Sequence, residues 1–264
     1  MRDPLRCSAT LAASLLAIVL GIRALSDRSL SQVSDNSANR LDAATHRTAA
    51  DDPTRFTSKE LSELQARFGV HGPQNGLAQI MTIGVDQFQP LRDNTLLRLR
   101  ELKPVILREA KKCRVNPMLL TAILFDEIQH SKPGEQWPLI TDSGLVKTFG
   151  PAQLGISELV HQKYLPQHPT SHERRWARRK LLDPNFNVQI LAGKIQRLKG
   201  VLGLPMHRAL DTSQSLDDAK AIATLAYLHN GKLDYPARVM RYMQDPELHG
   251  LIYSTDRDRL TVLV

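Results

Sequence analysis

Glu127 lies on an apolar stripe in the segment MLLTAILFDEIQH, which covers residues 118–130. Positions i, i+3, i+4, i+7 and i+8 of a helix share one face, and here they hold Leu120, Ile123, Leu124, Glu127 and Ile128. An ionised carboxylate that is buried without a partner is unfavourable, so its pKa rises and the group keeps its proton nearer to neutral pH. A neutral carboxylic acid can act as a general acid. Glu127 is therefore the first candidate for a catalytic residue.

Two plainer interpretations of Glu127 stay open. The side chain could lie at the edge of the stripe, near the end of the helix, and face water. It could instead pair with an arginine. Asp126 is the next residue in the sequence, but it is turned by about 100° around the helix. We therefore expect Asp126 not to share a pocket with Glu127 and not to serve as a partner acid.

Other patterns that carry chemistry are missing from the sequence. The nine histidines form no His/Cys cluster, so we expect no metal site. There is no Gly-rich phosphate loop and no Gly-x-Ser-x-Gly elbow, and we expect no cofactor. Two cysteines, Cys7 and Cys113, are too few for a disulfide scaffold.

The composition is that of a globular protein with a basic surface. The chain has 264 residues, of which 42% are hydrophobic and 23% charged, and this excludes a wholly disordered chain and a polytopic membrane protein. The formal net charge is +8, which indicates an anionic partner such as nucleic acid, phospholipid or an acidic cell-wall polymer. The basic run at 172–180 could bind phosphate or phospholipid, or could be the solvated face of a helix.

The N-terminal segment has the pattern of an export signal. Arg2 and Arg6 precede sixteen uncharged residues, 7–22, and Arg23 follows them. A basic segment before a short apolar run is typical of a secretory signal or a signal anchor, and spanning a bilayer takes about 20 apolar residues, with about 17 as the lower limit. We predict that residues 1–25 direct export, either as a cleaved signal or as an anchor that associates with a membrane.

The rest of the chain divides into a linker and a mainly α domain. Residues 26–55 are rich in Ser, Asp, Asn, Thr and Ala, which predicts a flexible linker, and residues 56–264 should form the folded domain. Apolar periodicity and capping residues predict six helices. Two of them are predicted over their full length, at 94–113 and 187–199, and the first of these should turn Leu97, Val105, Ile106 and Ala110 inward. For the other four the start is predicted, at Thr57 or Ser58, at Pro117, at Asp217 or Asp218, and at Pro236. A short hairpin could lie within 137–146.

Four segments, in this order, resemble the soluble lytic transglycosylase (lysozyme-like) domain family. They are residues 116–127, which fit the helix Pro-x-Leu-Leu-x-Ala-Ile-x-x-x-Glu, then 150–154, 182–188 and 225–227. In the second segment Gly150 and Gln153 match the family's Gly-Leu-Met-Gln block, and in the fourth Tyr227 matches the tyrosine of its Ala-Tyr-Asn turn. The resemblance covers about 105–243, roughly half of the chain. No single motif is specific, and the order of the four carries the resemblance.

The resemblance implies an enzyme that acts on peptidoglycan glycan strands. Ordinary glycosidases use two carboxylates, whereas this family cleaves the β-1,4 bond between N-acetylmuramic acid and N-acetylglucosamine with one glutamate and leaves 1,6-anhydro ends. Glu127 would be that general acid and base. Tyr227 would hydrogen-bond Glu127, and Gln153 would bind the sugar with help from backbone groups of Gly150. Such an enzyme would work in the periplasm or cell envelope, and we would expect it to have no nucleic-acid partner.

The chain departs from the family at three places. Ile128 stands where the family has serine, the segment 130–148 is an insertion, and Leu228 replaces the asparagine of the turn, with His229-Asn230-Gly231 directly after it. These changes leave two alternatives open. The domain could be a catalytically silent glycan-binding or scaffold protein. It could also be a hydrolysing muramidase that uses Glu135 or Asp142 of the insertion as a second acid.

Overall fold

The computed structural model describes residues 52–74, 76–86, 88–131 and 147–254. All of these residues except Asp52 belong to one compact unit that begins at Pro53. The predicted signal (1–25), nearly all of the linker (26–55) and the hairpin expected within 137–146 lie outside the described residues. The described part is mainly helical and contains one two-stranded sheet. The mainly α class is therefore confirmed. Among the described helices, none combines the length and apolar content that crossing a bilayer would need.

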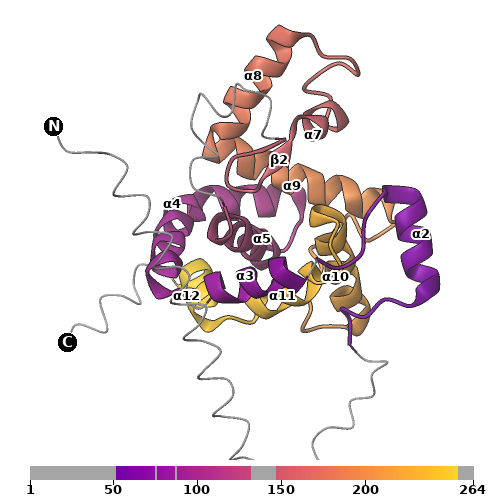
Figure 1. Cartoon of the computed structure of the whole chain (residues 1–264), viewed down its shortest axis with the longest axis vertical. Coiled ribbons are helices and arrows are strands. Elements are labelled where there is room, and N and C mark those ends of the chain that lie inside the picture. The colour runs from indigo at the N-terminus through magenta and orange to yellow at the C-terminus, as the bar shows by residue number, and fades with distance from the viewer. Residues whose placement is uncertain (1–51, 75, 87, 132–146, 255–264) are drawn as a thin grey trace, which may run out of the picture. The chain divides into compact units, whose positions relative to one another are not determined.

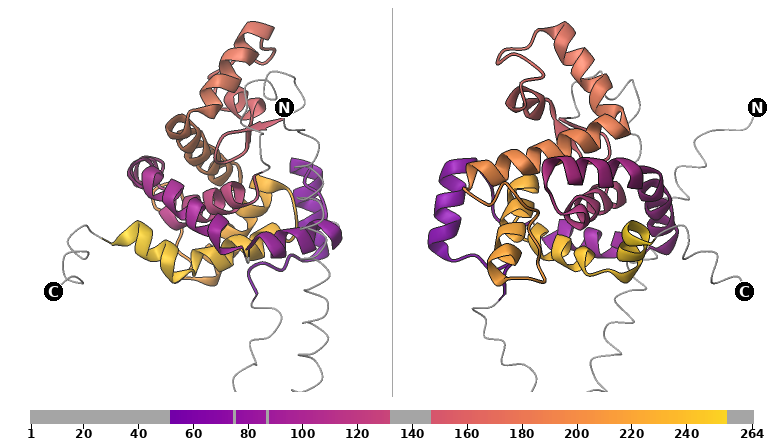
Figure 2. Two further views of the ribbon diagram at one scale, coloured as in Figure 1. Left: turned by 60° about the vertical axis from the view of Figure 1, so that its left-hand side comes forward. Right: turned by 180° about the vertical axis from the view of Figure 1, so that it is seen from behind.

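The described elements follow one another as a series of helices interrupted by a single strand pair (Figure 1). They are α2 (Ser58–Phe68), α3 (Gly76–Asp86), α4 (Gln89–Cys113), α5 (Pro117–Gln129), β1 (Thr148–Phe149), β2 (Leu154–Gly155), α7 (Ile156–His161), α8 (Ser171–Leu182), α9 (Pro184–Val201), α10 (Leu216–Asn230), α11 (Tyr235–Met243) and α12 (Pro246–Tyr253). In Figures 1 and 2, α7 and α8 project from one side of α9, and α10 to α12 lie on its other side.

Capping residues set the starts of the helices that the sequence predicted. At α2, Thr57 and Glu60 form a reciprocal capping box in which each side chain accepts a hydrogen bond from the other residue's backbone N–H. At α5, the side chain of Asn116 accepts a hydrogen bond from the backbone N–H of Met118 at 2.8 Å, and Pro117 occupies the first turn. The predicted starts of α2 and α5 are confirmed.

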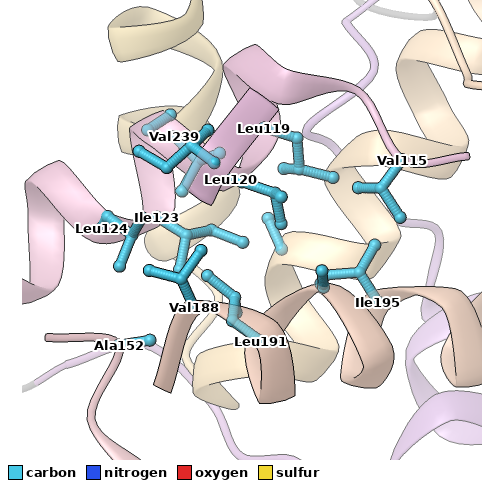
Figure 3. Packing of buried hydrophobic residues seen from close by; sticks show 14 of the residues in the cluster. Val115, Leu119, Leu120, Ile123, Leu124, Ala152, Val188, Leu191, Ile195 and Val239 are labelled. Atoms are coloured by element: carbon cyan, nitrogen blue, oxygen red, sulfur yellow. The ribbon is translucent and has the colours of Figure 1, made fainter. Parts of the chain in front are cut away.

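Helix α5 is the central helix of the unit. It packs against α4, α9, α11 and α12, and every side chain from Met118 to Asp126 is buried. Figure 3 shows the apolar side chains of α5 meeting those of α9 and α11; the labelled residues are Leu119, Leu120, Ile123 and Leu124 with Val188, Leu191, Ile195 and Val239. The sequence predicted one apolar stripe, whereas α5 is covered on nearly all sides. Between Met118 and Gln129, Glu127 alone is not fully buried.

Helix α4 begins at Gln89 instead of the predicted Asn94, and Val105, Ile106 and Ala110 are buried as expected. Leu97 was expected inward, but it is 54% exposed, and its neighbours Leu96 and Leu99 are buried in its place. The leucine-rich run at 96–102 is compatible with two helical phases, and the phase that buries three leucines is the one adopted. The sequence did not predict α3, α7 or α12, since short helices without a sustained apolar period give a weak signal.

The turn between the two strands is held by one side chain of α9. Strands β1 and β2 pair antiparallel, with Phe149 opposite Leu154. Asn187 donates from Nδ2 to the carbonyl oxygens of Phe149 and Leu181, each at 2.9 Å, and its Oδ1 accepts the N–H of Ala152 at 2.8 Å. Gly150 has φ +74, and a Cβ there would lie 2.1 Å from the carbonyl oxygen of Leu181. The turn therefore needs glycine at 150.

We expect Gly150→Ala to destabilise the protein by about 3 kcal/mol or more, because it adds a backbone clash to the strain of a left-handed alanine. Gly69→Ala is the matched control. Gly69 also has a left-handed backbone (φ +65), but a Cβ there meets nothing within 4 Å, so its cost should be only about 1 kcal/mol. Urea unfolding of both variants measures the difference. Equal costs would show that the turn can move away from Asn187.

Candidate active site

The carboxyl of Glu127 opens into a cavity of about 280 Å³. Three separate segments line it, and they contribute Glu127, His130 and Ser131 from the end of α5, Thr148 and Gln153 from the strand pair, and His229 and Asn230 from the end of α10. The side chain of Glu127 is 13% exposed. Neither plainer interpretation describes Glu127, because its side chain faces a cavity and its basic neighbour is a histidine, not an arginine.

Three polar groups converge on one oxygen of the Glu127 carboxyl. The hydroxyl of Tyr235 donates to Oε1 at 3.0 Å, and Nδ2 of Asn230 donates to the same oxygen at 3.3 Å. Nε2 of His229 lies 3.4 Å from Oε1. Among the residues that the structure describes, none donates a hydrogen bond to Oε2. The carboxyl is thus fixed through Oε1, and Oε2 is the oxygen left for a ligand.

These donors correct the expected pKa of Glu127. Burial by itself would raise the pKa of the carboxyl, as the sequence suggested, but the interaction with His229 and the hydrogen bonds from Tyr235 and Asn230 outweigh burial and lower the pKa. The apolar stripe predicted that Glu127 is buried, but it did not predict the groups that donate hydrogen bonds to its carboxyl. In the unliganded protein Glu127 is therefore ionised near neutral pH, and it must take up a proton before it can act as an acid.

Asp126 points away from the cavity, as its position on the helix predicted. It is 2% exposed, and its two oxygens accept hydrogen bonds from Nε and Nη2 of Arg238 on α11, at 2.9 and 3.2 Å. Arg238 also donates from Nη1 to Asp234 at 2.7 Å. The ion pair with arginine that was considered for Glu127 belongs to its neighbour.

His130 lines the cavity, but both of its ring nitrogens face the protein. Nδ1 lies 2.8 Å from the backbone oxygen of Asp126, and Nε2 lies 3.2 Å from Oδ1 of Asp86 at the end of α3. Burial would lower the pKa of His130, but the hydrogen bond with Asp86 and the charges of Asp126 and Asp86 raise it. His130 therefore connects α3 to α5, with both ring nitrogens close to oxygens of the protein.

Gln153 and Glu127 line the same cavity, as expected. Oε1 of Gln153 accepts a hydrogen bond from the hydroxyl of Thr148 at 2.6 Å, and its Nε2 donates to the carbonyl oxygen of Gly150 at 3.3 Å. Gly150 is not among the lining residues. It contributes to the site by shaping the turn that carries Gln153.

The expected hydrogen bond from Tyr227 to Glu127 is wrong. Tyr227 is fully buried, and its hydroxyl donates to the carbonyl oxygen of His71 at 2.7 Å. Tyr227 precedes His229 by two residues, which turns it by about 200° around α10, so the two side chains cannot face the same cavity. Tyr235, in the first turn of α11, supplies the tyrosine hydroxyl beside Glu127.

Sequence reasoning also missed the roles of His229 and Asn230. Asn230 reaches Glu127 because it is the last residue of α10. Gly231 closes the helix with φ 82. An Asn-Gly pair after a helical period is a stop signal, so the end of α10 could have been predicted. Its proximity to Glu127 could not.

The basic run at 172–180 does not line the cavity. The basic run at 172–180 falls in α8, where Ala177 and Leu181 are buried while Arg175 and Arg179 are exposed, as on a solvated helix face. In the described part of the chain, no three His, Cys, Asp or Glu side chains gather as metal ligands would. Glu135 and Asp142 lie outside the described residues.

The site can hold and move one proton. A carboxyl anchored through Oε1 presents Oε2 to the cavity, and Asn230 and Gln153 place amide groups beside it. Such groups suit a ligand that is rich in hydroxyl and amide functions. Comparisons of this chain with protein-family profiles, with curated proteins and with solved structures found no match.

Proposed function

We propose that the chain is a peptidoglycan lytic transglycosylase with a lysozyme-like fold, in which Glu127 is the single general acid and base. The observation that carries the proposal is the placement of Glu127. It lies in the cavity together with Gln153, and its Oε1 accepts hydrogen bonds from Tyr235 and Asn230, while Oε2 accepts none from the described residues. The order of the four sequence motifs supports the same assignment.

In the proposed reaction, Oε2 of Glu127 gives its proton to the glycosidic oxygen between N-acetylmuramic acid and N-acetylglucosamine. The bond from C1 of the muramic acid to that oxygen breaks as the proton arrives. Oε2 then takes the proton of the C6 hydroxyl, while the C6 oxygen bonds to C1 and forms the 1,6-anhydro ring. Glu127 ends the cycle protonated, as it began, and no water is consumed. Entry of the sugar displaces water from the carboxyl, which favours the protonated form that the first step needs.

The lining of the cavity favours this route over hydrolysis. A hydrolysing glycosidase needs a second carboxylate to activate water or to act as nucleophile. Among the described lining residues Glu127 is the one carboxylate. The substitution of Ile128 for serine does not argue for a silent protein, because the Ile128 side chain is 3% exposed and belongs to the core.

The products of digestion test the proposal. The full chain, incubated with purified cell-wall sacculi, should release muropeptides with 1,6-anhydro ends, as identified by mass spectrometry. Glu135→Gln and Asp142→Asn should release the same products. Reducing ends that depend on Glu135 or Asp142 would support the hydrolysing alternative. Binding to sacculi without any release would support a glycan-binding module.

Removal of the Tyr235 hydroxyl should move the pH profile of the reaction. A general acid is active when protonated, so its contribution to kcat/KM is present below its pKa and is lost as pH rises through that pKa. Tyr235 stabilises the ionised carboxyl, so Tyr235→Phe should raise the pKa of Glu127 and shift the descending limb to higher pH. Tyr227→Phe is the control, since its hydroxyl donates to His71. If the descending limb of the kcat/KM profile moves equally in both variants, the Tyr235 hydroxyl is not what stabilises the Glu127 carboxylate.

A further inference from the structure

His229 occupies an unusual position beside the Glu127 carboxyl. Its side chain, in the last turn of α10, is only 2% exposed, and Nε2 lies 3.4 Å from Oε1 of Glu127. Its other nitrogen, Nδ1, is buried and has no hydrogen-bond partner among the residues that the structure describes. His229 can therefore interact with the Glu127 carboxyl through Nε2, while no described residue forms a hydrogen bond with Nδ1.

The lack of a partner for Nδ1 determines which protonation state of the His229 ring is favoured. An imidazolium carries N–H groups on both nitrogens, so it would bury a charged donor at Nδ1 without an acceptor, which is costly. In the neutral ring with its proton on Nε2, Nδ1 carries only a lone pair, and the protonated Nε2 lies 3.4 Å from Oε1 of Glu127. The contacts of His229 therefore favour the neutral Nε2–H tautomer, not an ion pair with Glu127.

The charged groups around His229 agree with a neutral ring. Lys194 of α9 donates from Nζ to the backbone oxygen of His229 at 2.9 Å, so one buried cation already lies next to the pair. Glu127 of α5 and, farther away, Glu158 of α7 act in the opposite direction, and the uncharged Tyr235 of α11 stacks near the ring. Burial and Lys194 together prevail and lower the pKa of His229.

We propose that His229 is a positioning residue that stays neutral and donates its Nε2–H to Oε1 of Glu127 throughout the catalytic cycle. The inference deepens the proposed function and rests on it for its catalytic meaning. His229 gives up no proton at any step. It holds Oε1, stabilises the carboxylate that forms when Oε2 has delivered its proton, and leaves Oε2 as the oxygen that exchanges protons with the sugar.

The tautomer can be measured without any enzymatic activity. In the full chain labelled with ¹⁵N-histidine, long-range ¹H–¹⁵N spectra distinguish protonated from unprotonated ring nitrogens. His229→Gln identifies the signals of His229 among the nine histidines. We expect an unprotonated Nδ1 and a protonated Nε2 that do not change between pH 5 and 8. A ring that becomes doubly protonated in this range, or carries its proton on Nδ1, would overturn the proposal even if lytic activity is found.

Two substitutions test the donor itself. In His229→Gln, the amide nitrogen can take the place of Nε2 and donate to Oε1, whereas His229→Leu removes the donor. The Leu variant should raise the pKa of Glu127 by at least about one unit, seen in a ¹³C titration of the Glu127 carboxyl and in the descending limb of kcat/KM. The Gln variant should restore most of the shift. If neither the descending limb of the kcat/KM profile nor the titration of the Glu127 carboxyl moves in the two variants, the proposal is rejected. If the carboxyl titration shifts but the protein does not cleave sacculi, only the lytic function is rejected.

Discussion

Glu127→Gln is expected to lower the rate of sacculus cleavage by about 10²–10⁴-fold, which is the usual contribution of a general acid. The amide cannot deliver or accept the proton that Oε2 would exchange with the sugar. Its oxygen can still accept the hydrogen bonds that Tyr235 and Asn230 donate to Oε1, so the site should keep its shape. Release of anhydro-muropeptides under initial-rate conditions measures the loss.

The control for removing a negative charge is Glu63→Gln on the exposed side of α2. It should cleave at the wild-type rate. Circular dichroism and a cooperative thermal transition should show that Glu127→Gln stays folded, and the variant should still bind sacculi. A folded Glu127→Gln that cleaves as fast as the wild type would remove Glu127 from the mechanism, and with it the proposed activity.

Glu127 could be found from the sequence because its location depends on local rules. The cap at Asn116, the proline at 117 and the apolar spacing after them place the carboxyl near the end of a buried helix. The same rules placed Asp126 on a different face, and it does lie outside the cavity. What periodicity cannot tell is what fills the space beside a buried acid, so it predicted a raised pKa where the donors lower it.

The partners of Glu127 could not be predicted, because they come from distant parts of the chain. Tyr235 and Glu127 are 108 positions apart, and Asn230 and Glu127 are 103 apart. Their meeting depends on how α10 and α11 pack against α5, and no local pattern encodes that packing. The sequence pointed to Tyr227 because it matched a family turn, but that residue lies on the face of α10 that turns toward His71.

One face of α11 contacts both adjacent acids of α5. Tyr235 and Arg238 are three residues apart and so lie on the same side of the helix. Tyr235 donates to Glu127, and Arg238 donates twice to Asp126. The guanidinium also lies over the Tyr235 ring, 5.3 Å from its centre. The buried ion pair therefore fixes α11 in the register that brings the tyrosine hydroxyl to the Glu127 carboxyl.

Arg238→Met should accordingly destabilise the protein by about 3–5 kcal/mol, because it leaves the Asp126 carboxylate buried without its cation. The side chains of Arg238 and Asp126 are 12% and 3% exposed. Arg241→Met is the matched control on the same helix. Arg241 pairs with Asp86 but is 61% exposed, so its loss should cost no more than about 1 kcal/mol. Urea unfolding at neutral pH measures both values, and similar costs for the two variants would mean that the Asp126 pair does not hold α11 in place.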